Sequence, residues 1–205
     1  MTIDGLIKTD LNIIRNSDGD IYHGLKETDP GFVGFGEAYF STIKHCSIKA
    51  WKKHLDMTMN FIVPVGRIGI AIYDDRVDSR TNGVLNSYVL SPKSYFRLTI
   101  PPLLWVGFKG LSDSDSFLLN IANITHNPNE VDHKTIDEIK QLPGIGEYAI
   151  TFSPINSDIL NGSSGFPNPN ISFTRLIVRL MAENAMSNKL ANVNPSPSNP
   201  NIPFK

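Results

Sequence analysis

The residues between positions 49 and 54 combine three lysines, a tryptophan and a histidine just ahead of a strongly apolar run. Alternate side chains of a β-strand point to the same face, so Lys52 and His54 share one face and Trp51 lies on the other. A barrel strand with this pattern brings a base, a cation and an aromatic ring to a cavity wall. The same residues also fit a solvated basic strand edge. The stretch therefore predicts either an acid–base site or an exposed edge.

Many short strand-like segments, separated by turn residues, surround this stretch and must position it. They lie at residues 10–14, 37–44, 67–75, 84–90, 95–100, 103–108 and 117–124. Several alternate with period two, and turn signals recur about every ten residues, which favours an antiparallel sandwich or barrel. No long amphipathic helix is expected before Asp132. The sequence predicts an all-β domain.

The composition changes after about residue 141, where Ser, Asn, Gly and Pro dominate. Within this part, residues 173–186 have apolar positions spaced by three and four, which predicts one helix at about 172–187. So few apolar residues cannot form a core of their own. We therefore expect a barrel domain at residues 1–141 and a helical and irregular C-terminal extension at residues 142–205.

Charge and cysteine content exclude several classes of protein. The chain has 205 residues and a formal net charge of -1, which argues against a general nucleic-acid or anionic-membrane binder. The single cysteine, Cys46, rules out an internal disulfide framework and fits a reducing compartment. The sequence shows no signal peptide and no apolar run of transmembrane length, so we expect a cytoplasmic protein without membrane contact.

Six stretches together resemble the dTDP-4-dehydrorhamnose 3,5-epimerase (RmlC-like) family. They are FGEAYFST (35–42), KAWKKH (49–54), VPVG (63–66), IYDDR (72–76), IPPLLWVGFKGLS (100–112) and NITHNPNE (123–130). The resemblance covers residues 3–139 and rests on the order and spacing of the stretches. It implies a double-stranded β-helix (cupin or jelly-roll) barrel, a homodimer, and a nucleotide-diphosphate 4-keto-6-deoxy sugar as substrate. It also implies a role in the supply of sugars for surface polysaccharide.

The chemistry of such an epimerase sets the groups that its site must contain. A base removes a proton beside the ketone, an acid returns one to the opposite face, and a donor or cation stabilises the enolate. In typical members of the family a His, supported by an Asp, is the base and a Tyr is the acid. A Lys lies near the ketone, and an Arg helps to hold the diphosphate. The resemblance implies no cofactor.

The resemblance carries these roles onto particular positions of this chain. The Arg-Gly-Leu-His pattern of the family falls on residues 49–52, so Lys49 replaces the Arg and Lys52 replaces the base. The His of a related His-x-His-Lys pattern falls on His54. The acid Tyr falls on His126, and the Lys near the ketone falls around Met59 or Asn60. The supporting Asp has no clear counterpart, although Asp132 and Asp137 lie in the matching region.

Two hypotheses supply a base, and under both of them the protein is an active epimerase. Lys52 acts as base where burial and the neighbouring Lys53 favour the neutral amine. Alternatively His54 or His126 takes the proton, since imidazole titrates nearest neutrality. The catalytic candidates are Lys52, His54 and His126, and the substrate-binding candidates are Lys49, Trp51, Asn60, Arg76 and Trp105. If the two neighbouring lysines only bind phosphate as cations, the base is elsewhere.

Other functions are weighed against this one. A cupin metal site needs a His that Lys52 replaces, and His54 with His126 would be the only ligands, so we expect no metal. The segment LPGIG (142–146) resembles a helix-hairpin-helix element, yet Pro154 and the neutral chain that follows favour a helix end at Gly144. A sugar-nucleotide-binding cupin without activity, or an isomerase that moves the ketone between C3 and C4, remains as an alternative.

Overall fold

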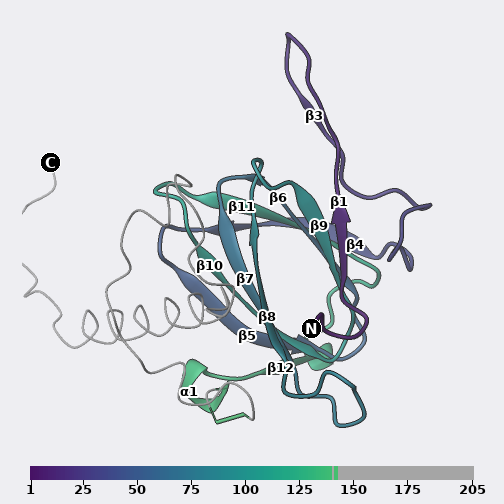
Figure 1. Ribbon diagram of the computed structural model, residues 1–205, viewed down its shortest axis with the longest axis vertical. Coiled ribbons are helices and arrows are strands. Elements are labelled where there is room, and N and C mark those ends of the chain that lie inside the picture. Colours follow the sequence, from purple (N-terminus) through teal and green to yellow (C-terminus); the bar gives the residue numbers. More distant parts are fainter. Residues whose placement is uncertain (140, 143–205) are drawn as a thin grey trace, which may run out of the picture.

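Two five-stranded antiparallel sheets face each other and form the barrel of the computed structural model, which describes residues 1–139 and 141–142 (Figure 1). The first sheet has the order β1 (Ile7–Asp10), β9 (Phe96–Ile100), β6 (Met59–Val65), β11 (Ser116–Ala122), β4 (Glu37–Ile43). The second has the order β12 (Val131–His133), β5 (Ile48–His54), β10 (Leu104–Gly110), β7 (Ile68–Asp74), β8 (Leu85–Leu90). The predicted double-stranded β-helix is confirmed.

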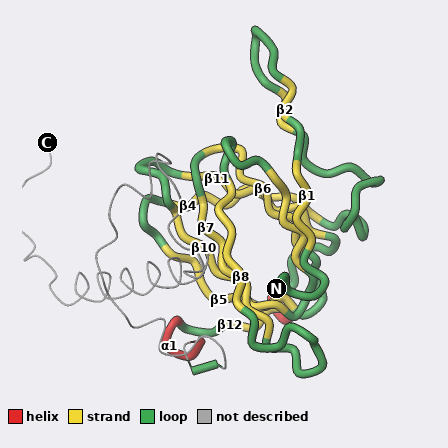
Figure 2. Tube along the Cα trace, viewed as in Figure 1, coloured by secondary structure: helices red, strands yellow, loops and turns green. Residues whose placement is uncertain are grey.

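Short elements lie at the margins of the barrel. The two-residue strands β2 (Ile13–Ile14) and β3 (Ile21–Tyr22) pair in an N-terminal arm that projects from the barrel (Figure 1). The 3-10 helix η1 (Pro128–Glu130) precedes β12, and α1 (Ile136–Ile139) lies beside β5 (Figure 2). Among the described residues, no helix has the length and apolarity needed to cross a membrane.

The barrel interior is filled by apolar side chains that alternate along the strands of both sheets. Buried members of this cluster include Met59, Phe61, Val63, Ile68, Ile70, Ile72, Phe96, Leu98, Ile100, Leu104, Val106 and Leu118. The rings of Phe61 and Phe108 meet edge to face with centroids 6.2 Å apart, which joins the two sheets across the interior. Because period-two alternation places these residues on one face of each strand, any polar residue in the same alternation also faces the interior.

A second apolar cluster covers the outer face of the second sheet. Trp51, Tyr73 and Trp105 are buried there with Ile139 of α1. The sheet is thus buried on both faces, which explains why β7 reads as an almost continuous apolar run.

The observed strands follow the predicted segments closely, with one difference near the N-terminus. The alternating segment at residues 10–14 forms parts of two strands: β1 pairs with β9, whereas β2 pairs with β3 in the arm. The predicted helix at 172–187 and the hairpin-like residues from Pro143 onward lie outside the described residues.

Candidate active site

The pairing of β5 with β10 turns two lysines toward the barrel interior. Lys52 lies opposite Val106 and Lys49 lies opposite Phe108, and both partners belong to the interior cluster. Strict alternation would place side chains three positions apart on opposite faces. A register shift between Val106 and Phe108 removes this conflict, as β-bulges do. Both ammonium groups therefore belong to the interior wall of the second sheet.

The facing wall, on the first sheet, presents polar side chains from β4 and β11. Tyr39 and Asn120 are direct partners, and the Asn120 Nδ2 donates a hydrogen bond of 3.1 Å to the Tyr39 hydroxyl. Lys49 reaches this wall: its Nζ donates to the Thr42 carbonyl at 2.9 Å and to the Ser41 Oγ at 3.5 Å. The lysine thus links the two walls near the turn that joins β4 to β5.

A buried histidine and carboxylate form a dyad at the far end of β5. The His54 Nδ1 lies 2.8 Å from the Glu130 Oε2, and the two residues are 7% and 4% exposed. By alternation from Lys52, His54 is on the interior face of the strand. A carboxylate can only accept, so a hydrogen lies on Nδ1, and in the neutral ring the lone pair of Nε2 is left for another group. This arrangement suits a general base.

Hydrogen bonds keep the Glu130 side chain ionised. Burial by itself would raise the pKa of this carboxyl, but the bonds from His54 and from two backbone amides outweigh it and lower the pKa below the usual value. The Oε1 accepts those two bonds, from the Asp56 amide at 2.8 Å and the Met57 amide at 2.7 Å. Hydrogen bonds to both carboxylate oxygens thus fix the position of the Glu130 side chain.

Glu130 is the residue that the sequence analysis missed. The expected support was an Asp, and the structure places Asp132 near Lys53, at 4.0 Å, and Asp137 on α1. Glu130 ends the family-like stretch at 123–130 and reaches His54 because its carbonyl accepts from the Leu55 amide and β12, which follows it, pairs with β5. Its position at the end of that stretch was the available signal.

The third catalytic candidate, His126, lies apart from the dyad. It is exposed in the loop between β11 and η1 and makes no hydrogen bond to another described residue. The structure therefore brings Lys52 and His54 together on one wall with Lys49 and leaves His126 in an exposed loop.

The two tryptophans among the substrate-binding candidates face away from the interior. Both belong to the cluster under α1, and Trp51 is 2% exposed. The indole Nε1 of Trp105 donates to Asp75 at 2.7 Å, and the ammonium of Lys53 lies 4.6 Å from its ring centroid. These contacts account for the tryptophans as packing and anchoring residues of the outer face.

Asn60 and Arg76 are also held outside the interior. Asn60 is on the outer face of the first sheet, where its Oδ1 accepts a 2.7 Å bond from the Thr99 hydroxyl. Arg76 pairs with the fully buried Asp74 through two contacts of 2.8 Å. Burial alone would raise the pKa of Asp74, but bonds from Arg76, Ser79 and Thr81 lower it well below the usual range.

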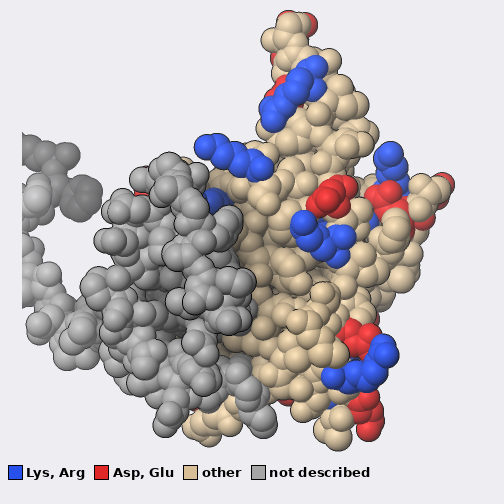
Figure 3. Space-filling view, viewed as in Figure 1, with Lys and Arg blue, Asp and Glu red and all other residues tan. Residues whose placement is uncertain are grey.

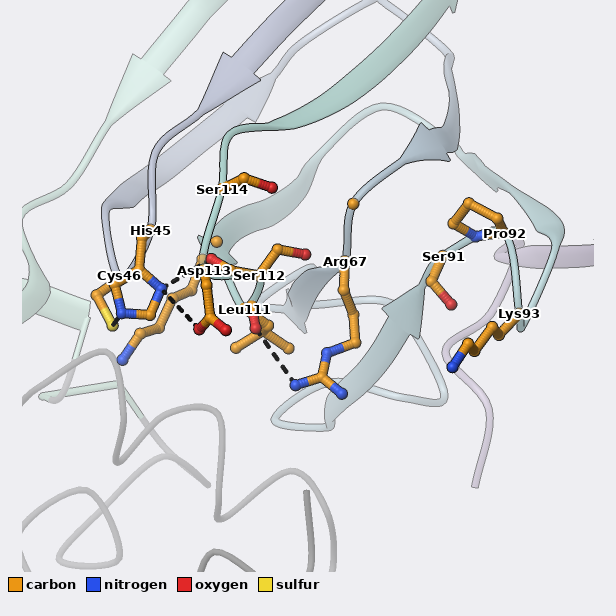
Figure 4. A pocket seen from close by; sticks show the side chains of 13 residues that line it. His45, Cys46, Arg67, Ser91, Pro92, Lys93, Leu111, Ser112, Asp113 and Ser114 are labelled. Atoms are coloured by element: carbon orange, nitrogen blue, oxygen red, sulfur yellow. Dashed lines mark hydrogen bonds and ion pairs between the residues drawn. The ribbon is translucent and has the colours of Figure 1, made fainter. Parts of the chain in front are cut away.

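A cavity of about 860 Å³ opens where four strand connections meet at the other end of the barrel (Figure 4). Its cationic lining comes from Arg67, Lys93 and Lys109. The His45 Nδ1 donates a 2.7 Å hydrogen bond to the Ser112 carbonyl there. None of the sequence-predicted site residues lines it. We place the reaction at the interior wall instead, because only there does a histidine have a carboxylate partner among the described residues at hydrogen-bond distance.

Charged side chains are mixed over one face of the barrel, and the described residues lack the arrangement that a metal ion needs. On the face shown in Figure 3, acidic and basic side chains stand beside each other instead of forming a continuous basic surface. In the described part of the chain, no three His, Cys, Asp or Glu side chains come together in a way that could hold a metal ion.

Comparison with known proteins finds similarity to two proteins of glycan or polysaccharide biosynthesis. The chain is 34% identical over 124 residues to the probable low-salt glycan biosynthesis epimerase Agl13 of Haloferax volcanii, covering 60% of this chain and 74% of that protein. It is 28% identical over 135 residues to the spore coat polysaccharide biosynthesis protein SpsL of Bacillus subtilis, covering 65% and 89%. No protein-family model matches the chain.

Solved structures agree with the sequence relatives. A dTDP sugar isomerase from Desulfovibrio desulfuricans superposes with a TM-score of 0.63 at 36% identity, covering 65% of this chain and 85% of that one. The dTDP-6-deoxy-D-glucose-3,5-epimerase of Legionella pneumophila superposes with a TM-score of 0.59 at 19% identity, covering 65% and 74%, which supports the fold alone. The chain therefore belongs to the dTDP-4-dehydrorhamnose 3,5-epimerase (RmlC-like) family of cupins and is an isomerase of the epimerase type.

Proposed function

We propose that the protein epimerises a nucleotide-diphosphate 4-keto-6-deoxy sugar and that His54, held by Glu130, is the base. The observation that carries this proposal is the buried dyad, with 2.8 Å between Nδ1 and Oε2, on the same strand face as Lys52. The Nε2 lone pair takes the proton from the carbon beside the ketone. The electron pair of the broken C–H bond then forms the enolate. No cofactor is needed for this step, since the ketone itself accepts the charge.

The two interior lysines supply positive charge for the anionic groups of this reaction. Lys52 stands two positions from His54 and stabilises the negative oxygen of the enolate. Lys49 lies nearer the β4–β5 turn, and we assign to it the role of the arginine that holds the diphosphate in typical members of the family. On this assignment Lys52 is an electrostatic catalyst, and His54 replaces it as the base.

A second reaction of the same chemistry is a migration of the ketone from C4 to C3. The similarity to a dTDP sugar isomerase, at 36% identity, is the observation that supports this ketone migration as a second candidate. The residues that remove the proton would be the same, and the difference lies in the atom to which a proton returns. An enediol that is protonated at C4 gives the 3-keto sugar, whereas protonation at the original carbon from the other face gives the epimer.

Solvent exchange separates these reactions. The protein is incubated with dTDP-4-keto-6-deoxyglucose in heavy water, and deuterium at C3, C4 and C5 is followed by proton NMR. Inversion with deuterium at C3 or C5 supports the epimerase, and deuterium at C4 with a 3-keto product supports the ketone migration. Nucleotide binding without exchange at any carbon would mean that the site binds this sugar without enolising it. His54→Gln should abolish exchange, whereas His23→Gln, in a loop outside the barrel interior, should retain it.

We further propose that the enzyme works as a homodimer. The outer face of the first sheet carries large apolar side chains in contact with solvent: Phe40 is 62% exposed, Val65 51% and Phe117 37%. Phe117 lies opposite Val65 in the sheet, and Phe40 belongs to the neighbouring strand β4. A contiguous apolar sheet face of this kind is typical of a subunit contact. A second copy of the same chain would cover it with its own equivalent face.

A further inference from the structure

The wall opposite His54 contains one buried amide whose hydrogen-bonding capacity is only half used. Asn120 is fully buried between Leu118 and Ala122 of the interior cluster. Its Nδ2 donates to Tyr39, while its Oδ1 has no hydrogen-bond partner among the described residues. Buried polar groups are normally satisfied, so an exception on a cavity wall indicates a place where a ligand supplies the missing group.

Tyr39 lies beside this amide, and its hydroxyl can still donate a hydrogen bond. Its hydroxyl oxygen accepts the Asn120 bond, so the phenolic hydrogen is left for another acceptor. Tyr39 is 42% exposed although it lies on the interior face of β4, so solvent and small molecules can reach it. The ring therefore lies at an open part of the wall instead of in the packed core.

The strand connections bring Tyr39 and Lys52 to similar depths on facing walls. The contact between Lys49 and Ser41 fixes the level of β5 relative to β4. Tyr39 lies two residues from Ser41 along β4, and Lys52 lies three residues from Lys49 along β5. Both steps lead away from the turn that joins the two strands. At the usual rise these steps are about 7 and about 10 Å. A sugar ring between the walls would have the lysine and histidine on one side and the phenol on the other.

We propose that Tyr39 is the acid of the reaction and that Asn120 positions it while bonding a polar group of the sugar. This inference rests on the proposed function, because it supplies the proton donor that the reaction needs on the opposite face. His54 takes the proton from one face, and the Tyr39 O–H bond breaks as its proton adds to the same carbon from the other face. The enolate electrons form the new C–H bond and the ketone is restored. His54 then loses, and Tyr39 regains, one proton through solvent.

The test compares exchange with inversion in the same heavy-water experiment. Tyr39→Phe should keep the exchange of the substrate's own C–H, because His54 can remove a proton and return a deuteron on its own side. Inversion should fall by about 100-fold or more, which is the usual contribution of a general acid. Tyr22→Phe, on the projecting arm, is the matched control and should keep the wild-type ratio of inversion to exchange. Asn120→Leu, which keeps the volume, should raise KM and lower the same ratio.

Each outcome decides between the proposals. A wild-type ratio in Tyr39→Phe, or an equal loss of exchange and inversion, would overturn the assignment of Tyr39 as the acid. If His126→Ala alone gave exchange without inversion, the acid would be His126. Absence of exchange in the wild-type protein would instead remove the proposed function, and this inference with it. Urea unfolding of each variant shows whether a lost ratio comes from a lost fold.

Discussion

Replacing Glu130 by Gln tests the base without removing any side chain from the site. The amide oxygen of the new residue can still accept from the Asp56 and Met57 amides, which Glu130 bonds at 2.8 and 2.7 Å. The amide nitrogen then faces the His54 Nδ1, where the carboxylate oxygen lies at 2.8 Å in the native protein. Two donors cannot bond each other, so the ring must move its hydrogen to Nε2. The nitrogen that should accept the substrate's proton then carries one already.

Two effects set the size of the expected loss. A hydrogen bond to a charged group contributes about 1.5–3 kcal/mol, which is about 10- to 150-fold in rate if it is fully used to stabilise the imidazolium. The wrong tautomer costs more: the corresponding carboxylate-to-amide change in serine proteases lowers kcat about 10⁴-fold. We therefore expect Glu130→Gln to lower the rate of deuterium exchange by about 10²- to 10⁴-fold.

The assay is the initial rate of deuterium entry into the sugar at saturating substrate. Glu138→Gln is the matched control, because Glu138 is an exposed carboxylate whose hydrogen bonds stay within Thr135 at the start of α1. It should keep the wild-type rate. An unchanged rate in Glu130→Gln, in a protein that unfolds like the wild type, would refute His54 as the base and return that role to Lys52.

Three further predictions concern the lysine, the subunit contact and a buried ion pair. Lys52→Met should lower the exchange rate about 100-fold by removing the cation beside the enolate, with Lys26→Met unchanged as control. Phe40→Ser should convert the dimer to a monomer in light scattering, and a monomeric wild type would contradict the proposed contact. Asp74→Asn should lower the free energy of unfolding in urea by about 3–5 kcal/mol, because it leaves Arg76 without its charged partner. The lowered pKa of Asp74 stabilises the fold above the unfolded value of about 4, and this contribution is lost as pH falls through the folded-state pKa. The wild type should therefore lose more stability than the variant between about pH 5 and pH 2.

The barrel could be predicted because each strand carries its own signal. Segments such as 95–100 alternate with period two, and turn residues separate them, so the all-β class follows from local sequence. Alternation also placed Lys52 and His54 on one face and Trp51 on the other. It failed for Lys49, which strict alternation assigns to the face of Trp51, because the register shift against β10 depends on a partner strand that is distant in the sequence.

The candidate site was harder to predict, since its parts come together only through tertiary contacts. Glu130 is 76 residues from His54 in the sequence and meets it through the pairing of β12 with β5. Asn120 and Tyr39 are 81 residues apart and share a face only because β11 pairs with β4 in that register. Asn60 fell on the outer face because one residue of register decides which side of a strand a side chain takes. No pattern within a single segment contains these relations.

The two oxygens of Glu130 divide between folding and chemistry, and this division can be measured. Oε1 accepts two backbone amides of the β5–β6 connection, whereas Oε2 bonds only His54. Glu130→Gln keeps the first role, so its free energy of unfolding should fall by no more than about 1–2 kcal/mol while exchange is nearly lost. Glu130→Ala removes both roles and leaves two amides unbonded, so it should cost about 3 kcal/mol or more. A buried imidazole–carboxylate pair contributes little net free energy of unfolding, because an apolar pair of similar volume often stabilises a core equally well. If both variants lost equal stability and equal activity, the bond between His54 and Glu130 would have only a structural role. If Glu130→Gln instead loses nearly all activity and little stability, the bond supports His54 as the base.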